Sequence, residues 1–145
     1  MGQPDSARRL IPEGIEKMRL EAKGLARLGL RWDAVFSSPY HRALETAQIV
    51  AETLRTPEIQ IETGIISGAF RLSVLQDLVT PYPREAHLLF VGHEPDMSHL
   101  TYELTGAQIA MKKGGLAHIE ATHPEPSQGI LRWLLAPSHL ARLGE

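Results

Sequence analysis

The chain has 145 residues, with 15 basic and 17 acidic side chains, 43% hydrophobic residues and no cysteine. A chain of this length is expected to form a single domain over residues 1–145, with a core large enough to fold without disulfides or structural metals. The absence of cysteine excludes thiol nucleophiles and zinc ribbons. The nearly balanced charge predicts no nucleic-acid partner. The sequence has no signal peptide and no apolar run of ~18 residues, which predicts a cytoplasmic protein with no membrane partner.

The first half of the chain alternates helix, strand and helix. Apolar residues recur every three or four positions from Pro12, which predicts a helix that ends at Gly29. The apolar run 34–36 predicts a buried strand. A second helix is expected to follow at once, with Ser38 as its N-cap residue, and to continue to about Leu54.

The second half continues the alternation and closes with two strands. A weak strand, a short helix, a strongly apolar strand and another helix are predicted, in this order, at 59–62, 72–79, 87–92 and 96–105. Two further strands, at 115–122 and 129–136, flank a loop with two prolines and are expected to form an antiparallel pair. The whole pattern predicts an α/β fold of three layers, α/β/α, whose sheet is mostly parallel with an antiparallel C-terminal edge.

The beginning of the chain departs from this alternation. A loop and a helix come first, where an α/β fold normally begins with a strand. We therefore expect the domain to lack its first strand within these residues.

Two strand-to-helix junctions carry residues suited to binding a phosphoryl group. The first contains Ser37, Ser38 and Arg42, and the second contains Gly92 and His93. Ligands of open α/β sheets bind beyond the carboxyl ends of the strands, and a helix N-terminus there attracts anions. Arg42 could form two hydrogen bonds to phosphate oxygens.

Each of these residues also has an ordinary structural interpretation. An arginine near a helix start is commonly a solvated surface residue, and a histidine after a strand is commonly structural. Arg8 and Arg9 could also be solvated. No metal site and no cofactor are predicted, because His93 and His99 do not have the spacing of an HExxH motif and no cysteine supports them. The sequence also contains no P-loop and no GxGxxG or GxSxG motif.

The segment from Ser37 to Ala47, with the letters SSPYHRALETA, resembles the SPxxRAxxTA block of the histidine phosphatase superfamily. Residues 91–95, VGHEP, resemble the second histidine motif of that superfamily, and Arg8–Gly14 resembles the start of the first helix in its small bacterial branch, the SixA-like phosphohistidine phosphatases. The resemblance implies a phosphoglycerate mutase-like fold. It also implies that Arg42 binds the phosphoryl oxygens, that His93 contacts the phosphoryl group and that Arg8 binds substrate near the mouth of the pocket.

One motif of the superfamily has no counterpart in the sequence. The resemblance implies a nucleophilic histidine in an Arg-His-Gly triplet at the end of the first strand, and no such triplet occurs in the 145 residues. We expect this histidine upstream of Met1, and we expect the 145-residue chain alone to be inactive.

Three hypotheses follow. The first is a phosphohydrolase that acts on phosphohistidine in proteins or on small phosphomonoesters, so that its partner is a phosphorylated protein or a small phosphoester. The second is a catalytically inactive phosphate- or phosphoprotein-binding module that keeps Arg42 and His93 without the nucleophile. The third is a structural α/β domain without a phosphate site. The short connection 56–86 leaves the predicted pocket open, which favours a phosphoryl group carried by a protein.

Overall fold

The computed structural model describes residues 4–145. Its helices are α1 (Pro12–Arg27), α2 (His41–Leu54), α3 (Leu72–Val79), α4 (Asp96–Thr105) and α5 (Pro137–Gly144), with short 3-10 turns η1 (Asp5–Ala7) and η2 (Thr63–Ile65). Its strands are β1 (Ala34–Ser37), β2 (Ile59–Ile61), β3 (Leu88–Val91), β4 (Leu116–Glu120) and β5 (Ile130–Leu135).

The strands form two sheets. In the first, β1 lies between β2 and β3 and runs parallel to both, so that Val35 is opposite Ile59 on one side and Leu89 on the other. In the second, β4 pairs antiparallel with β5, and a bulge interrupts the register between His118 and Ile119. The α/β fold, the parallel sheet and the antiparallel C-terminal pair are confirmed. The antiparallel strands make a sheet of their own in place of an edge on the parallel one.

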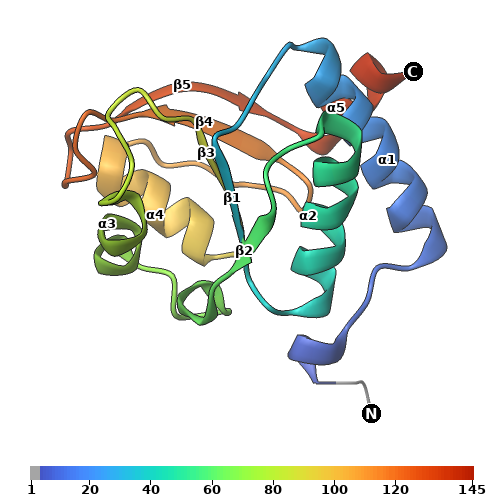
Figure 1. Ribbon diagram of the computed structural model, residues 1–145, viewed down its shortest axis with the longest axis horizontal. Coiled ribbons are helices and arrows are strands. Elements are labelled where there is room, and N and C mark those ends of the chain that lie inside the picture. Colours follow the sequence, from blue (N-terminus) through green and yellow to red (C-terminus); the bar gives the residue numbers. More distant parts are fainter. Residues whose placement is uncertain (1–3) are drawn as a thin grey trace.

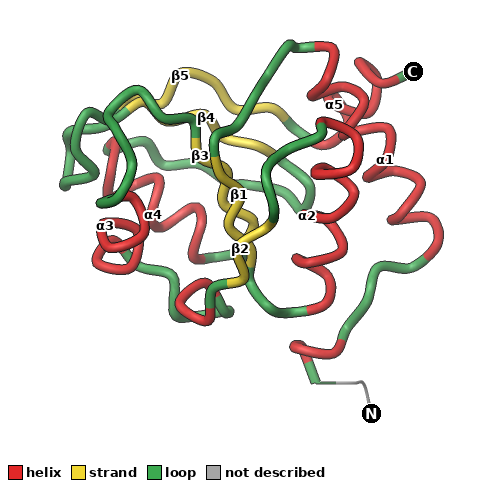
Figure 2. The backbone as a smooth tube through the Cα atoms, in the orientation of Figure 1, coloured by secondary structure: helices red, strands yellow, loops and turns green. Residues whose placement is uncertain are grey.

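Helices cover both faces of the parallel sheet, which gives the predicted three layers. In Figure 1, α1, α2 and α5 lie on one side of β1 to β3, and α3 and α4 lie on the other. Figure 2 shows the same layers as red helices around the central yellow strands. Side chains of β1 point alternately into two cores: Phe36 packs on the α3 and α4 side, and Val35 packs on the α1 and α2 side. All four residues of β1 are buried.

Three details differ from the sequence-based expectations. Helix α5 was not predicted. Because α5 packs on α1, the buried stripe of α1 includes Gly24, and Glu21 is buried with its carboxylate beside Gly114. Ala26 and Leu28, which were expected inside, are exposed. Ser38 is not the N-cap of α2, because Tyr40 occupies that position and makes no side-chain capping bond.

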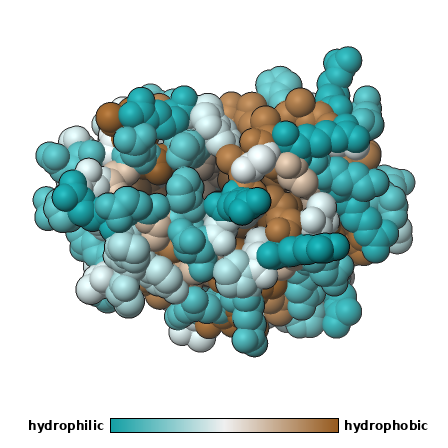
Figure 3. Space-filling model, turned by 45° about the horizontal axis from the view of Figure 1, so that its top comes forward, coloured by the Kyte–Doolittle hydropathy of each residue, from teal (hydrophilic) through white to brown (hydrophobic). Residues whose placement is uncertain are grey.

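Some hydrophobic surface remains open. When the view of Figure 1 is turned so that its top comes forward, hydrophobic side chains are seen among polar ones on the surface (Figure 3). Exposed large apolar residues include Ile130 and Leu134 of β5. Within residues 4–145, no helix is long and apolar enough to span a membrane.

Candidate functional site

The carboxyl ends of β1 and β3 meet at one edge of the parallel sheet. Ser37 pairs with Val91 as the last residue pair of these strands, and the Ser38 amide extends the pairing by donating to the Val91 carbonyl over 3.0 Å. Ser37 and Ser38 are fully buried. The two junctions singled out in the sequence are therefore adjacent in space, as expected for neighbouring parallel strands.

His93 is held against the first junction. Its Nε2 atom lies 2.7 Å from the Ser38 hydroxyl oxygen, a hydrogen-bond distance. The Tyr40 ring lies beside the imidazole, with the two ring centroids 4.9 Å apart. The Ser38 hydroxyl also accepts a hydrogen bond of 3.1 Å from the Tyr40 amide. One serine side chain thus connects the end of β1, the turn before α2 and the histidine that follows β3.

The environment of His93 favours its neutral form. Burial lowers its pKa below the usual 6.5, and the nearby positive charge of Arg42 lowers it further. The carboxylates of Asp5 and Asp96 act in the opposite direction. A neutral imidazole can donate a hydrogen bond through one ring nitrogen and accept a hydrogen bond or a proton through the other.

Arg42 lies in the first turn of α2 and forms an ion pair with the carboxylate of Asp5. Its guanidinium donates a hydrogen bond of 2.9 Å to the Asp5 carboxylate. The same carboxylate oxygen lies 4.0 Å from the Arg8 guanidinium. All three side chains are partly solvent-exposed. The carboxylate of Asp5 therefore occupies the position between two arginines where an oxyanion could bind.

The start of α2 adds backbone donors to this edge. The first N–H groups of a helix have no partner within it, and Tyr40, the N-cap residue, provides no side-chain acceptor for them. The partial positive charge of a helix N-terminus favours anions at this place. Arg42 and the first turn of α2 thus present positive charge on the same side as His93.

Glu94, which follows His93 in the sequence, forms its side-chain hydrogen bonds with the first turn of α4. Its carboxylate accepts hydrogen bonds from the Ser98 amide, at 2.9 Å, and from the Ser98 hydroxyl, at 2.5 Å. These bonds stabilise the first turn of α4, in the manner of a capping residue. Another carboxylate, Asp96, accepts hydrogen bonds from the amides of Gly68 and Phe70 and so fixes the loop before α3.

The structure brings together Arg42, His93 and, at the periphery, Arg8, the three residues that the sequence singled out. Sequence reasoning did not anticipate three of their neighbours, Asp5, Ser38 as a partner of His93, and Tyr40. The Ser-Ser-Pro sequence at a strand end was the available signal for Ser38, but it was interpreted as a helix cap. Among residues 4–145, no three histidine, aspartate or glutamate side chains cluster as metal ligands do.

Comparison with known sequences identifies the family. Residues 1–67 match the sequence profile of the histidine phosphatase superfamily (branch 1). An uncharacterised protein of Picosynechococcus sp. (strain ATCC 27264 / PCC 7002 / PR-6) is 31% identical over 120 residues, which cover 77% of this chain and 71% of that protein. The chain belongs to the histidine phosphatase superfamily.

Several solved phosphatase structures share the fold of the chain. A structure of the protein histidine phosphatase SixA complexed with tungstate superimposes with a TM-score of 0.85 at 21% identity, covering 97% of this chain and 91% of that one. A putative phosphohistidine phosphatase SixA from Agrobacterium tumefaciens gives 0.76 at 22% identity, with coverages of 94% and 88%. A phosphoserine phosphatase mutant from Entamoeba histolytica gives 0.74 at 17% identity, with coverages of 95% and 89%. The phosphoglycerate mutase-like architecture expected from the resemblance is confirmed.

Proposed function

We propose that the protein is a phosphohydrolase that removes phosphoryl groups from phosphohistidine in proteins or from small phosphomonoesters. The observation that carries this proposal is the convergence of Arg42 and His93 at the carboxyl edge of the parallel sheet, beside the open start of α2. Membership of the histidine phosphatase superfamily supports the reaction class.

Each site residue has a separate role in this reaction. Arg42 binds the phosphoryl oxygens in place of the Asp5 carboxylate, and Arg8 holds a further oxygen at the mouth of the site. His93 contacts the phosphoryl group and stabilises the negative charge that develops during transfer. Binding of an anion raises the pKa of His93, because it adds negative charge beside the imidazole.

The reaction forms a covalent intermediate on a histidine. An imidazole nitrogen attacks phosphorus, the bond to the leaving group breaks, and water then hydrolyses the phosphohistidine to release inorganic phosphate and free imidazole. The 145 residues contain no Arg-His-Gly triplet. The proposal therefore assigns the nucleophile to a strand encoded upstream of Met1.

The substrate class follows from the shape of the chain around the site. The connection between α2 and β3 consists of β2, η2 and the eight-residue helix α3, with no inserted domain. A phosphoryl group on a protein surface needs such an open approach. A phosphorylated protein is thus the favoured partner.

A rapid-quench experiment with a ³²P-labelled histidine-phosphorylated protein tests the mechanism. The gene product extended upstream of Met1 should form an acid-labile phosphoenzyme and release phosphate. Arg42→Ala and His93→Ala should each lower kcat/KM by about a hundred-fold or more, the loss typical of a removed charge-stabilising group. Arg19→Ala, which changes an exposed residue paired with Glu16 on α1, is the matched control and should retain full activity.

Two outcomes would contradict the proposal. Turnover by the 145-residue chain alone would show that no upstream nucleophile is needed. Wild-type rates in both Arg42→Ala and His93→Ala would show that the site lies elsewhere.

The second candidate function is a phosphate- or phosphoprotein-binding module. The observation in its favour is that Arg42 and His93 are in place in a chain without the nucleophile triplet. The nucleotide sequence upstream of Met1 separates the two candidates. A strand in frame that ends in Arg-His-Gly supports the enzyme, and a stop codon before any such triplet supports the binding module.

A further inference from the structure

The loop between β2 and α3 crosses the carboxyl edge of the parallel sheet, and we call its residues 62–70 the edge loop. At its start, the Glu62 amide donates a hydrogen bond of 2.9 Å to the carbonyl of Ser37, the last residue of β1. The loop also reaches the end of β3, since a Cβ atom at Gly92 would lie 3.0 Å from Cγ2 of Ile65. The edge loop therefore adjoins both junctions that form the candidate site.

The edge loop and Arg42 lie on opposite faces of the sheet. Ile65 and Phe70 of the loop are buried in the apolar core on the α3 and α4 side, together with Phe36 of β1. Arg42 belongs to α2, which lies on the other side of the strands (Figure 1). His93 follows β3, which separates these two layers. A group bound at His93 therefore has Arg42 on one side and the edge loop on the other.

One buried carboxylate holds the edge loop to α4. Asp96, in the first turn of α4, is 9% exposed. Its Oδ2 atom accepts hydrogen bonds from the amides of Gly68, over 2.8 Å, and Phe70, over 3.3 Å. Gly68 has a φ of +86°, a conformation that glycine adopts readily and other residues rarely do. We call these two bonds the latch, and the charge of the acceptor makes them stronger than bonds between neutral groups.

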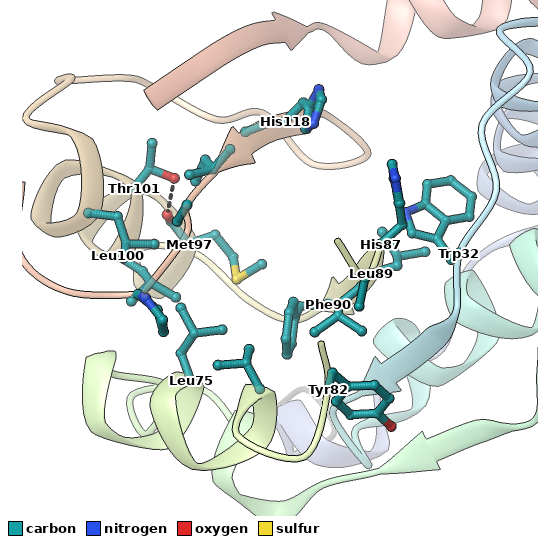
Figure 4. Close-up of a pocket in the computed structure, with 18 of the residues that line it drawn as sticks. Trp32, Leu75, Tyr82, His87, Leu89, Phe90, Met97, Leu100, Thr101 and His118 are labelled. Carbon is teal, nitrogen blue, oxygen red and sulfur yellow. Dashed lines mark hydrogen bonds between the residues drawn. The ribbon is translucent and has the colours of Figure 1, made fainter. Parts of the chain in front are cut away.

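Asp96 also lies near His93. The negative charge of Asp96 raises the pKa of the His93 imidazole. The first turn of α4 joins the two residues, because the Met97 amide donates a hydrogen bond of 3.1 Å to the His93 carbonyl. Met97 packs beneath the same junction: its Sδ atom would lie 3.2 Å from a Cβ at Gly92, and its side chain reaches toward Phe90 of β3 (Figure 4). A displacement of Asp96 or of the edge loop is therefore transmitted to His93.

We propose that Asp96 is a positioning residue of the phosphoryl site, which holds the edge loop against His93 on the side opposite Arg42. Without the latch, the loop is free to leave the carboxyl edge and His93 loses its support on that side. Ser38 and Tyr40 continue to hold the other side of the imidazole. The part of this proposal that concerns a phosphoryl oxyanion rests on the proposed function, whereas the latch itself does not.

Two variants of Asp96 separate the latch from the charge. Asp96→Asn removes the negative charge but keeps a carbonyl oxygen that can accept from both amides. Asp96→Ala removes the charge and the acceptor. Loss of a nearby negative charge should by itself tighten the binding of an anion, whereas loss of the latch should weaken it. The direction of the change in Asp96→Ala therefore shows which effect dominates.

Tungstate binding to the 145-residue chain, measured by isothermal calorimetry, is the first test. Asp96→Asn should bind tungstate at least as tightly as the wild type, and Asp96→Ala should bind it about five-fold more weakly or worse. Gly68→Ala should also weaken binding with Asp96 unchanged. The reason is that alanine is disfavoured at a φ of +86°, so this variant strains the latch from the loop side.

NMR measurements follow the latch without a ligand. The amides of Gly68 and Phe70 should exchange with solvent at least about ten-fold faster in Asp96→Ala than in the wild type, because their acceptor is gone. They should stay protected in Asp96→Asn. The carbon-bound proton signals of the His93 imidazole should shift or broaden in Asp96→Ala and keep their line widths in Asp96→Asn.

Thr101→Ala is the matched control on α4. Thr101 is also buried, and its hydroxyl donates a hydrogen bond of 2.8 Å to the Met97 carbonyl, the dashed line in Figure 4. This bond stays within α4 and does not reach the edge loop. The variant should lower the urea midpoint of unfolding and leave the tungstate affinity and the His93 signals unchanged.

Three results would overturn the proposal. The first is equal exchange of the Gly68 and Phe70 amides in the wild type and Asp96→Ala. The second is tungstate binding by Asp96→Ala as tight as that by Asp96→Asn, in a protein whose Arg42→Ala variant binds weakly. The third is a loss of affinity in Thr101→Ala equal to that in Asp96→Ala, which would make the effect one of general stability.

Failure of the proposed function would give a different pattern. Arg42→Ala and His93→Ala would then bind tungstate as the wild type does. In that case the exchange rates and the His93 signals decide on the latch alone, and changes confined to Asp96→Ala would support it.

Discussion

Glu21→Gln is expected to stabilise the protein by up to about 3 kcal/mol at about pH 8 and to leave its stability almost unchanged at about pH 4. Glu21 lies on α1 with 2% of its surface exposed. Burial raises its pKa from 4.5 to about 7, and the positive charge of Lys17 offsets only part of this effect. Glutamine has nearly the same shape and no charge, so it removes the cost of a buried carboxylate.

The pH dependence follows from where the proton is bound. Below about pH 4.5 the carboxyl is protonated in both the folded and the unfolded chain, and burial carries no electrostatic penalty. Between about pH 4.5 and 7 the unfolded chain releases the proton while the folded chain keeps it, so that stability falls as the pH rises. Above about pH 7 the carboxylate is ionised in the folded chain as well, and the full cost of burying its charge lowers the stability.

Urea unfolding of both proteins at several pH values measures this difference. The free energy of unfolding of Glu21→Gln minus that of the wild type should rise with pH to a plateau. Glu52→Gln, which changes an exposed residue of α2, is the control and should show a difference near zero throughout. Parallel curves for Glu21→Gln and the wild type would contradict the assignment of a raised pKa to Glu21.

Gly24→Ala is expected to destabilise the fold by about 3 kcal/mol or more, the upper range for overpacking. A Cβ atom at Gly24 would lie 2.1 Å from the backbone carbonyl oxygen of Leu140 in α5. A backbone carbonyl cannot change rotamer to relieve this clash as a side chain can. Helix α5 would therefore have to move away from α1. Gly144, on α5, makes the reciprocal close approach to the Leu20 carbonyl of α1.

Gly14→Ala provides a matched control in the same helix. The nearest atom to a Cβ at Gly14 belongs to the Leu10 side chain, at 3.7 Å, which is an ordinary contact. Alanine favours the helix by up to about 1 kcal/mol relative to glycine, so this variant should be equal to or more stable than the wild type. Urea or thermal unfolding of both variants measures the effect. A Gly24→Ala protein as stable as Gly14→Ala would show that α1 and α5 are not packed so closely.

The sequence predicted the elements that build the candidate site, because their signals are local. The apolar run of β1, the strongly apolar β3 and the immediate helix starts after both were readable, and parallel strands bring their carboxyl ends together. Helix α5 was also readable in principle, since Pro137 at its first position and the spacing of Leu140 and Leu143 are typical helix signals.

Other features depend on contacts between distant residues and have no local signal. The ion pair of Asp5 with Arg42 spans 37 positions, and the contact of Ser38 with His93 spans 55. Glu21 resembles any surface glutamate of an amphipathic helix in the sequence, and only the fold places its carboxylate beside Gly114, 93 positions away.

Titration with tungstate by isothermal calorimetry tests the anion site at the carboxyl edge most directly. The wild type should bind one tungstate. Arg42→Ala and His93→Ala should each weaken binding by about ten-fold or more, because each removes a hydrogen bond to a charged group. Asp5→Asn should tighten binding, since the competing carboxylate is gone, and Arg19→Ala should bind as the wild type does. Equal affinity in the wild type, Arg42→Ala and His93→Ala would contradict the account.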